Sequence, residues 1–138
     1  MTLHRIMTVA ALAAFTATGN VSADDTEMEK AMSTASKSLK SLRTIPKDDY
    51  TAAADAVRTA HEAILKSMSY TASMVAEMPD GLEKQKALAD SRRILGLNYS
   101  ALCELELAYL EGDAAKIEAA TEKMKETKKE GHKKYTDD

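Results

Sequence analysis

Aromatic residues are scarce in this chain, which has no tryptophan, one phenylalanine and five tyrosines. The phenylalanine, Phe15, lies in an apolar N-terminal segment, so the core of the remaining chain must consist of Ala, Leu, Ile, Val and Met. Cysteine occurs once, as Cys103, which excludes a disulfide within the chain. Because a lone thiol in an oxidising compartment is usually buried and inert, we expect Cys103 to pack beside the core, with pairing between chains as the alternative.

The chain also lacks a large excess of one charge, since 22 acidic residues stand against 19 basic ones for a net charge of −3. A mildly acidic chain binds nucleic acids poorly. The lysines near the C-terminus alternate with Glu126 and Glu130, as on a solvated helix face. No carboxylate pair, nucleophile beside a base or phosphate-binding glycine loop stands out. We therefore expect neither nucleic-acid binding nor enzymatic activity.

Residues 1–23 have the pattern of a secretory signal peptide. His4 and Arg5 provide a basic start, an apolar stretch follows at 6–17, and small residues at 21–23 suit cleavage after Ala23. The alternative is an uncleaved anchor, but the apolar stretch is shorter than the roughly 20 residues that a membrane span needs. We predict one domain, residues 24–138, in the bacterial periplasm and not attached to a membrane.

Residues that favour turns divide this domain into four segments rich in Ala, Lys, Glu and Leu, which favour helix. The turns lie at 43–49, 78–81 and 111–113. The first helix is predicted to begin near Asp25, where Thr26 and Glu29 have the spacing of a capping box. Its apolar seam consists of Met28, Met32, Ala35, Leu39 and Leu42.

The second helix is predicted to begin at an N-cap, Asp48 or Asp49, and to run to Met78, where Pro79 ends it. Its inward stripe is predicted to be Ala53, Val57, Ala60, Ile64, Met68, Thr71, Val75 and Met78.

The third helix is predicted to begin after Gly81 and to run to Glu111, with Gly112 as its C-terminal stop and Asp113 as the cap of the fourth. A heptad repeat in the third helix consists of Leu88, Leu95, Leu102 and Tyr109, with Leu105 at a second position and the poor core fillers Ser91 and Asn98 between them. The fourth helix has an inward stripe of Ile117, Ala120 or Thr121, Met124, Thr127 or Lys128, His132 and Tyr135.

Four amphipathic helices with short connections predict an all-α fold, an antiparallel up-down-up-down four-helix bundle. In such a bundle the first helix starts at the end where the fourth finishes, and the two are neighbours. Met32 lies about two turns into the first helix and His132 about one turn from the end of the fourth. The topology therefore brings a thioether and an imidazole toward one end of the core.

A histidine and a methionine on neighbouring helices suit a haem iron that is held from both faces. The sequence has no C-x-x-C-H motif, so covalent attachment of haem is not expected. Geometry alone leaves the alternatives open that Met32 is a core residue and that His132 is a solvated surface residue.

Two segments resemble those of the cytochrome b562 family of small periplasmic proteins. "MSTASKSLKSL" (32–42) is similar to the family pattern M-x-T-x-x-x-x-L-K-x-[IL], which starts at the axial methionine. "LELAYLEGDAAKIEAATEKMKETKKEGHKKY" (105–135) is similar to the family's final stretch, which ends L-K-x-T-x-x-x-x-H-x-K-Y, with Met124 in place of the leucine. The resemblance implies one non-covalent b-type haem, axial ligands Met32 and His132, and electron transfer to an unidentified redox partner protein by a monomer.

The sequence departs from the family pattern near the expected haem. Ser91 and Leu95 occupy positions where the family has aromatic side chains, and Lys128 replaces an arginine. Lys128 remains a possible partner of a haem propionate, although it lacks the bidentate fork of arginine. Gly131 replaces a larger residue and is predicted to loosen the last turn by about 1 kcal/mol relative to alanine. These differences predict weaker haem binding.

Other residues offer alternative ligands. Met28 lies one turn before Met32 on the same face and is a competing axial ligand, while His61 borders the inward stripe of the second helix and is interpreted as a boundary residue. The alternative function is a haem-free bundle that binds a protein partner, or copper through the thioethers of Met68, Met74 and Met78.

Overall fold

The structure is a computed structural model that describes residues 19–136, with side chains from residue 27 onward. Over this range it is all-α, as predicted, and its five helices pack against one another without any strand. The helices are α1 (Gly19–Ser41), α2 (Tyr50–Ser67), α3 (Ser73–Ala76), α4 (Leu82–Glu111) and α5 (Ala114–Tyr135). Most of the predicted signal peptide, residues 1–18, lies outside the described residues.

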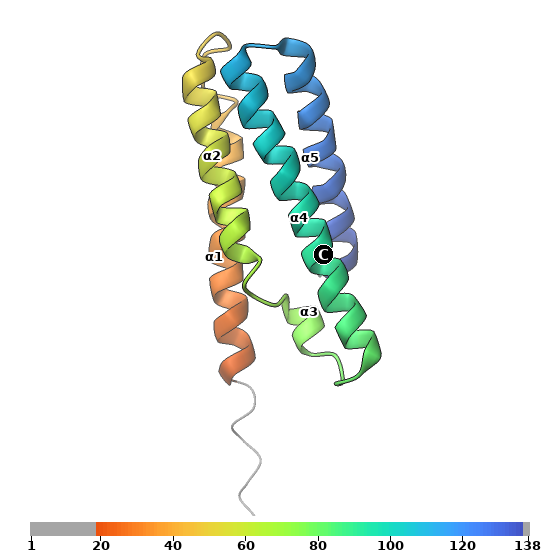
Figure 1. The fold of residues 1–138 in the computed structure, drawn as a ribbon. Helices are drawn as coiled ribbons and strands as arrows, with labels where there is room; N and C mark the ends of the chain where they lie inside the picture. The colour runs from red at the N-terminus through yellow and green to blue at the C-terminus, as the bar shows by residue number, and fades with distance from the viewer. Residues whose placement is uncertain (1–18, 137–138) are drawn as a thin grey trace, which may run out of the picture.

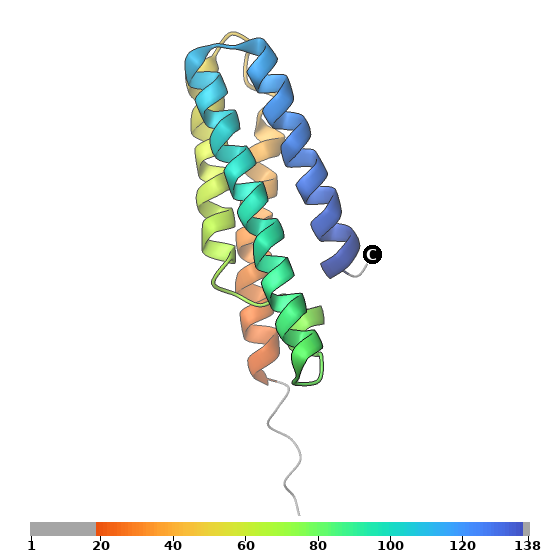
Figure 2. The same ribbon diagram turned by 45° about the vertical axis from the view of Figure 1, so that its right-hand side comes forward.

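Successive long helices run in opposite directions (Figure 1). In that view α1 and α4 rise, whereas α2 and α5 descend, and the short α3 lies between the lower parts of α1 and α4. After a turn of 45° (Figure 2), α5 ends in the lower half of the molecule, which is also where α1 begins. Within residues 19–136 no helix has the length and apolar character needed to cross a membrane.

The predicted second helix is interrupted, and its continuous extension to Met78 is wrong. α2 ends at Ser67, and the separate helix α3 begins only at Ser73. The hydroxyl of Ser67 donates to the carbonyl of Ile64 at 2.7 Å, and that of Ser69 donates to the carbonyl of Lys66 at 2.9 Å. Serine side chains that bond to the backbone in this way compete with helical hydrogen bonds. The apolar spacing continues across the break, which is why periodicity did not reveal it.

The predicted start of the first helix is also wrong, because α1 begins at Gly19 rather than near Asp25. Thr26 therefore lies inside the helix, where its backbone amide already has a partner four residues earlier. While residues 19–25 continue the helix, a capping box at Thr26 and Glu29 has no free amides to satisfy.

The other predicted helix ends are confirmed. A carboxylate oxygen of Asp49 accepts from the amide of Ala52 at 3.0 Å, and one of Asp113 accepts from the amide of Lys116 at 3.1 Å. Gly112 adopts the left-handed conformation, with φ of 64°, that ends α4 and lets α5 turn back. These caps depend on neighbouring residues only, so sequence was sufficient to predict them.

Small and branched aliphatic side chains form the core. Its buried members are Ala35, Val57, Ala60, Ala63, Ile64, Ala101, Leu102, Leu105, Ala120 and Met124. Helix α1 packs on α2, α2 on α4, and α4 on α5, whereas α1 and α5 make few direct contacts. The first and last long helices are therefore held by the middle pair rather than by each other.

Two buried polar residues that seemed poor core fillers are satisfied. Asn98 donates to the carbonyl of Met124 at 3.2 Å and to the hydroxyl of Thr127 at 2.8 Å, which ties α4 to α5. Ser91 donates to the carbonyl of Leu88 in its own helix at 2.9 Å. Buried polar groups cost little when they are hydrogen-bonded, so both are compatible with the core.

Candidate cofactor cavity

A cavity of about 670 Å³ lies between α1, α3, α4 and α5. This volume is in the range of about 300–1,000 Å³ that is usual for small-molecule and cofactor sites. Its apolar walls come mainly from Met28, Met32, Ala35, Leu39, Ile64, Ala72, Ile94, Leu95, Met124 and Tyr135. It occupies the region where α1 and α5 are not packed against each other.

Met32 lines this cavity from α1, and Met28 lines it from one turn earlier. Both side chains are half-buried, so neither is a fully packed core residue. Residues four apart share a helix face. Both methionines considered as ligands on sequence grounds therefore lie on the cavity wall.

His132 lines the cavity from α5 and is exposed. Its carbonyl accepts from the amide of Thr136 at 3.2 Å, but its ring forms no hydrogen bond with the described part of the chain. The imidazole is thus not committed to a structural interaction with those residues, and its ring nitrogens are available to a ligand in the cavity.

Lys128 lies one turn before His132 and also lines the cavity. It is exposed and makes no ion pair with residues 27–136, whereas Lys134 pairs with both Asp90 and Glu130. An unpaired ammonium group at the rim of a cavity is suited to an anionic substituent of a ligand.

Ser91 and Leu95 both line the cavity. Ser91 is buried and Leu95 is half-buried. Small and aliphatic side chains at these positions leave this wall without the stacking surface that an aromatic ring provides.

Gly131 allows close contact between α5 and α4. A β-carbon at this position would lie 3.2 Å from Cγ2 of Ile94, tighter than an ordinary van der Waals contact. Ile94 is 3% exposed, so it has little room to move. The prediction that Gly131 only loosens the last turn was incomplete, because the glycine also sets the helix spacing beside His132.

The end of α5 is anchored to α4 by Tyr135, whose hydroxyl donates to a carboxylate oxygen of Asp90 at 2.6 Å. This hydrogen bond, with further ones from Arg93 and Lys134, lowers the pKa of Asp90 to about 2. Burial and the bond to Asp90 raise the pKa of Tyr135 to about 12. The anchor fixes the helix three residues beyond His132 and therefore helps to position the cavity wall.

The remaining candidate ligands lie outside the cavity. His61 is half-buried, as predicted for a boundary residue, and its Nε2 lies 2.5 Å from an Oε atom of Glu106, which also binds Arg58. Burial alone would raise the pKa of Glu106, but the hydrogen bonds from His61 and Arg58 outweigh it and lower the pKa. Cys103 is half-buried on α4, and it does not line the cavity.

Met68, Met74 and Met78 are half-buried and do not line the cavity either. Met68 reaches toward Gly96, where an added β-carbon would lie 3.8 Å from its methyl carbon. The three methionines therefore contribute nothing to the volume that Met32 and His132 share.

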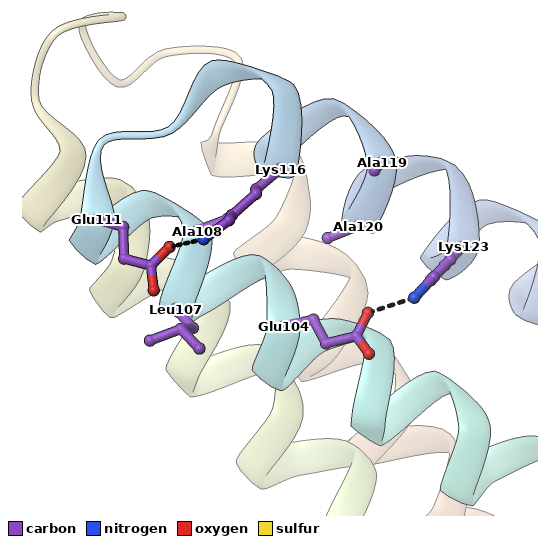
Figure 3. Close-up of a pocket in the computed structure, with 8 residues that line it drawn as sticks. All are labelled: Glu104, Leu107, Ala108, Glu111, Lys116, Ala119, Ala120 and Lys123. Atoms are coloured by element: carbon purple, nitrogen blue, oxygen red, sulfur yellow. Dashed lines mark hydrogen bonds and ion pairs between the residues drawn. The ribbon is translucent and has the colours of Figure 1, made fainter.

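A second hollow of about 290 Å³ lies between α4 and α5 near their connection (Figure 3). Two ion pairs cross it, Glu111 with Lys116 at 2.6 Å and Glu104 with Lys123 at 2.9 Å. All four charged side chains are exposed and already paired. The hollow is better explained as a gap between surface ion pairs than as a ligand site.

Sequence reasoning identified Met28, Met32, Lys128 and His132 but missed other parts of the cavity wall. Ala72 and Ser73 line it from the break between α2 and α3 and from the start of α3. That segment was predicted to continue a helix, so no sequence signal placed it there.

The donor set of the cavity does not suit a hard metal ion. Among the described residues, no group of three or more His, Cys, Asp or Glu side chains is placed to hold a metal ion. A thioether and an imidazole instead line an apolar cavity from two helices. Comparisons with known proteins add no evidence, because no family model, curated protein or solved structure gave a significant match to this chain.

Proposed function

We propose that this chain is a member of the cytochrome b562 family, with an antiparallel up-down-up-down four-helix bundle of α1, α2, α4 and α5. It binds one b-type haem without covalent attachment and carries electrons in the periplasm, after removal of residues 1–23. It acts as a monomer with a separate redox partner protein, and it catalyses no reaction of its own.

The observation that carries this proposal is the position of Met32 and His132. The family-like motifs single out these two residues, which are 100 positions apart in the sequence. Both line one cavity of about 670 Å³, from α1 and α5. Nothing in the local sequence around either residue requires this, so the motif and the tertiary arrangement support the proposal independently.

Each residue has a defined part in the proposal. Met32 would hold the haem iron through its thioether and His132 through its imidazole, while Lys128 would neutralise a propionate at the rim. Haem held by these two residues would supply one-electron transfer rather than chemistry on a substrate. The wall that includes Ile94 and Leu95 is aliphatic and would pack against the haem ring.

The test is titration of the purified protein with hemin, followed by reduction and visible spectroscopy. We expect a Soret shift that saturates at one equivalent and sharp, split α and β bands after reduction. Met32→Ala and His132→Ala should each abolish the split bands, because either change removes one axial ligand.

Matched controls distinguish ligation from general damage. Met68→Leu and His61→Gln alter the same residue types outside the cavity and should leave the spectrum unchanged. The absence of any Soret shift in the unmodified protein would refute haem binding. Split bands that survive Met32→Ala or His132→Ala would refute the assigned ligands.

A further inference from the structure

Soft metal donors are concentrated on the wall of the large cavity. Three methionines, Met28, Met32 and Met124, line it together with His132. Met28 and Met32 lie on successive turns of one face of α1, where residues four apart have β-carbons about 5–6 Å apart. Met124 lies two turns before His132 on α5 and is buried at 8% exposure, so it belongs to the packed interior.

The chemistry of these side chains favours a soft, monovalent metal ion. Thioethers select Cu(I) over ions such as Zn²⁺ and Mg²⁺, which prefer charged or oxygen ligands, and imidazole also binds copper. Methionine has three rotatable bonds, so two half-buried thioethers on adjacent turns can adjust to one ion. The ring of His132 has no hydrogen-bond partner among residues 27–136 that would compete for it.

The charged side chains on the cavity wall do not favour one metal ion over another. Glu29 and Lys128 both line the cavity and carry opposite charges. Selectivity must then come from the softness of the donors. The earlier candidates for copper, Met68, Met74 and Met78, are not placed on this wall.

We propose that, without haem, the thioethers of Met28 and Met32 and the imidazole of His132 bind one Cu(I) or Ag(I) ion. This goes beyond the proposed haem function, because Met28 is a ligand for the metal and has no part in haem ligation. The two occupants share Met32 and His132 and therefore exclude each other.

The experiment uses Ag(I) as a probe that needs no reductant, followed by Cu(I) in competition with a chromophoric chelator under reducing conditions. All proteins carry Cys103→Ser, which removes the only thiol. We expect one equivalent to bind. Since loss of even an outer partner lowers metal affinity by about 10- to 100-fold, Met28→Leu, Met32→Leu and His132→Gln should each lower it by about tenfold or more.

Met68→Leu and Met74→Leu are matched controls, and both should leave the affinity unchanged. Exchange of methionine for leucine conserves volume and usually preserves the fold. A measurement on the protein without methionine substitutions provides a second line of evidence: among the methionine methyl signals in a ¹H–¹³C spectrum, those of Met28 and Met32 should shift on addition of Ag(I).

The outcomes separate this proposal from haem binding. Metal binding without any hemin binding would refute the haem function alone. Unchanged Ag(I) affinity in Met28→Leu or in His132→Gln, or methyl shifts confined to methionines outside the cavity, would overturn the metal site.

Discussion

Replacement of Gly131 by alanine tests whether the glycine exists for helix spacing or only weakens the helix. Alanine in place of glycine favours helix by at most about 1 kcal/mol. The added methyl group would lie 3.2 Å from Cγ2 of Ile94, which is buried and β-branched and therefore stiff about χ1. Overpacking of a well-packed site costs about 1–3 kcal/mol. We expect Gly131→Ala to lower the free energy of unfolding by about 1 kcal/mol, the difference between these two effects.

The assay is urea unfolding followed by circular dichroism, with the slope of the transition monitored to confirm two-state behaviour. The same substitution is then made in an Ile94→Leu background, where the γ-methyl branch that meets position 131 is absent. There the helix propensity of alanine should dominate, and Gly131→Ala should stabilise the protein. A stabilising effect of Gly131→Ala in the unmodified protein, or the same effect in both backgrounds, would refute the packing argument.

Three other predictions concern the anchor, a helix cap and the cavity rim. Tyr135→Phe should reduce stability most near neutral pH. The lowered pKa of Asp90 stabilises the fold above about pH 4, and this stabilisation is lost as the pH falls toward 2. The raised pKa of Tyr135 stabilises the fold below about pH 10, and that stabilisation is lost as the pH rises toward 12. Urea unfolding across pH checks this, and a deficit that does not change with pH would contradict it. Asp113→Ala should cost about 1 kcal/mol because it removes the cap on the amide of Lys116, whereas Asp113→Ser should restore most of it in the same assay. Lys128→Gln should weaken hemin binding by no more than about fivefold, because an exposed charge contributes at most about 1 kcal/mol. The split bands should remain. Their loss would mean that Lys128 does more than pair with a propionate.

The positions of Ser91 and Leu95 bear on the prediction that this chain binds haem weakly. Ser91 and Leu95 lie on the cavity wall, so the departures from the family pattern change the site itself rather than a distant surface. Restoring an aromatic ring at Leu95 would add the contact area that the pocket lacks. The tie between Asn98 and Thr127 and the anchor at Tyr135 would still hold α5 in place.

Features that depend on neighbouring residues were determined by the sequence alone. The all-α class, the caps at Asp49 and Asp113 and the left-handed end of α4 at Gly112 follow from short-range chemistry, and the structure confirms them. Apolar periodicity gave a wrong prediction where serine side chains favoured the end of a helix. Apolar spacing continues through Ser67, where α2 ends and where the hydroxyls of Ser67 and Ser69 bond to backbone carbonyls.

The sequence predicted that Met32 and His132 lie toward one end of the core, but only the tertiary structure placed both on the wall of one cavity. Met32 and His132 meet at one cavity because α2 and α4 hold α1 and α5 apart, and no pattern within either helix specifies that spacing. The role of Gly131 is a property of the same packing, since its contact with Ile94 joins residues 37 positions apart. Helix formation depends on nearby residues, so sequence periodicity can predict it. The gap between α1 and α5 depends instead on the side chains that pack α1 on α2, α2 on α4 and α4 on α5.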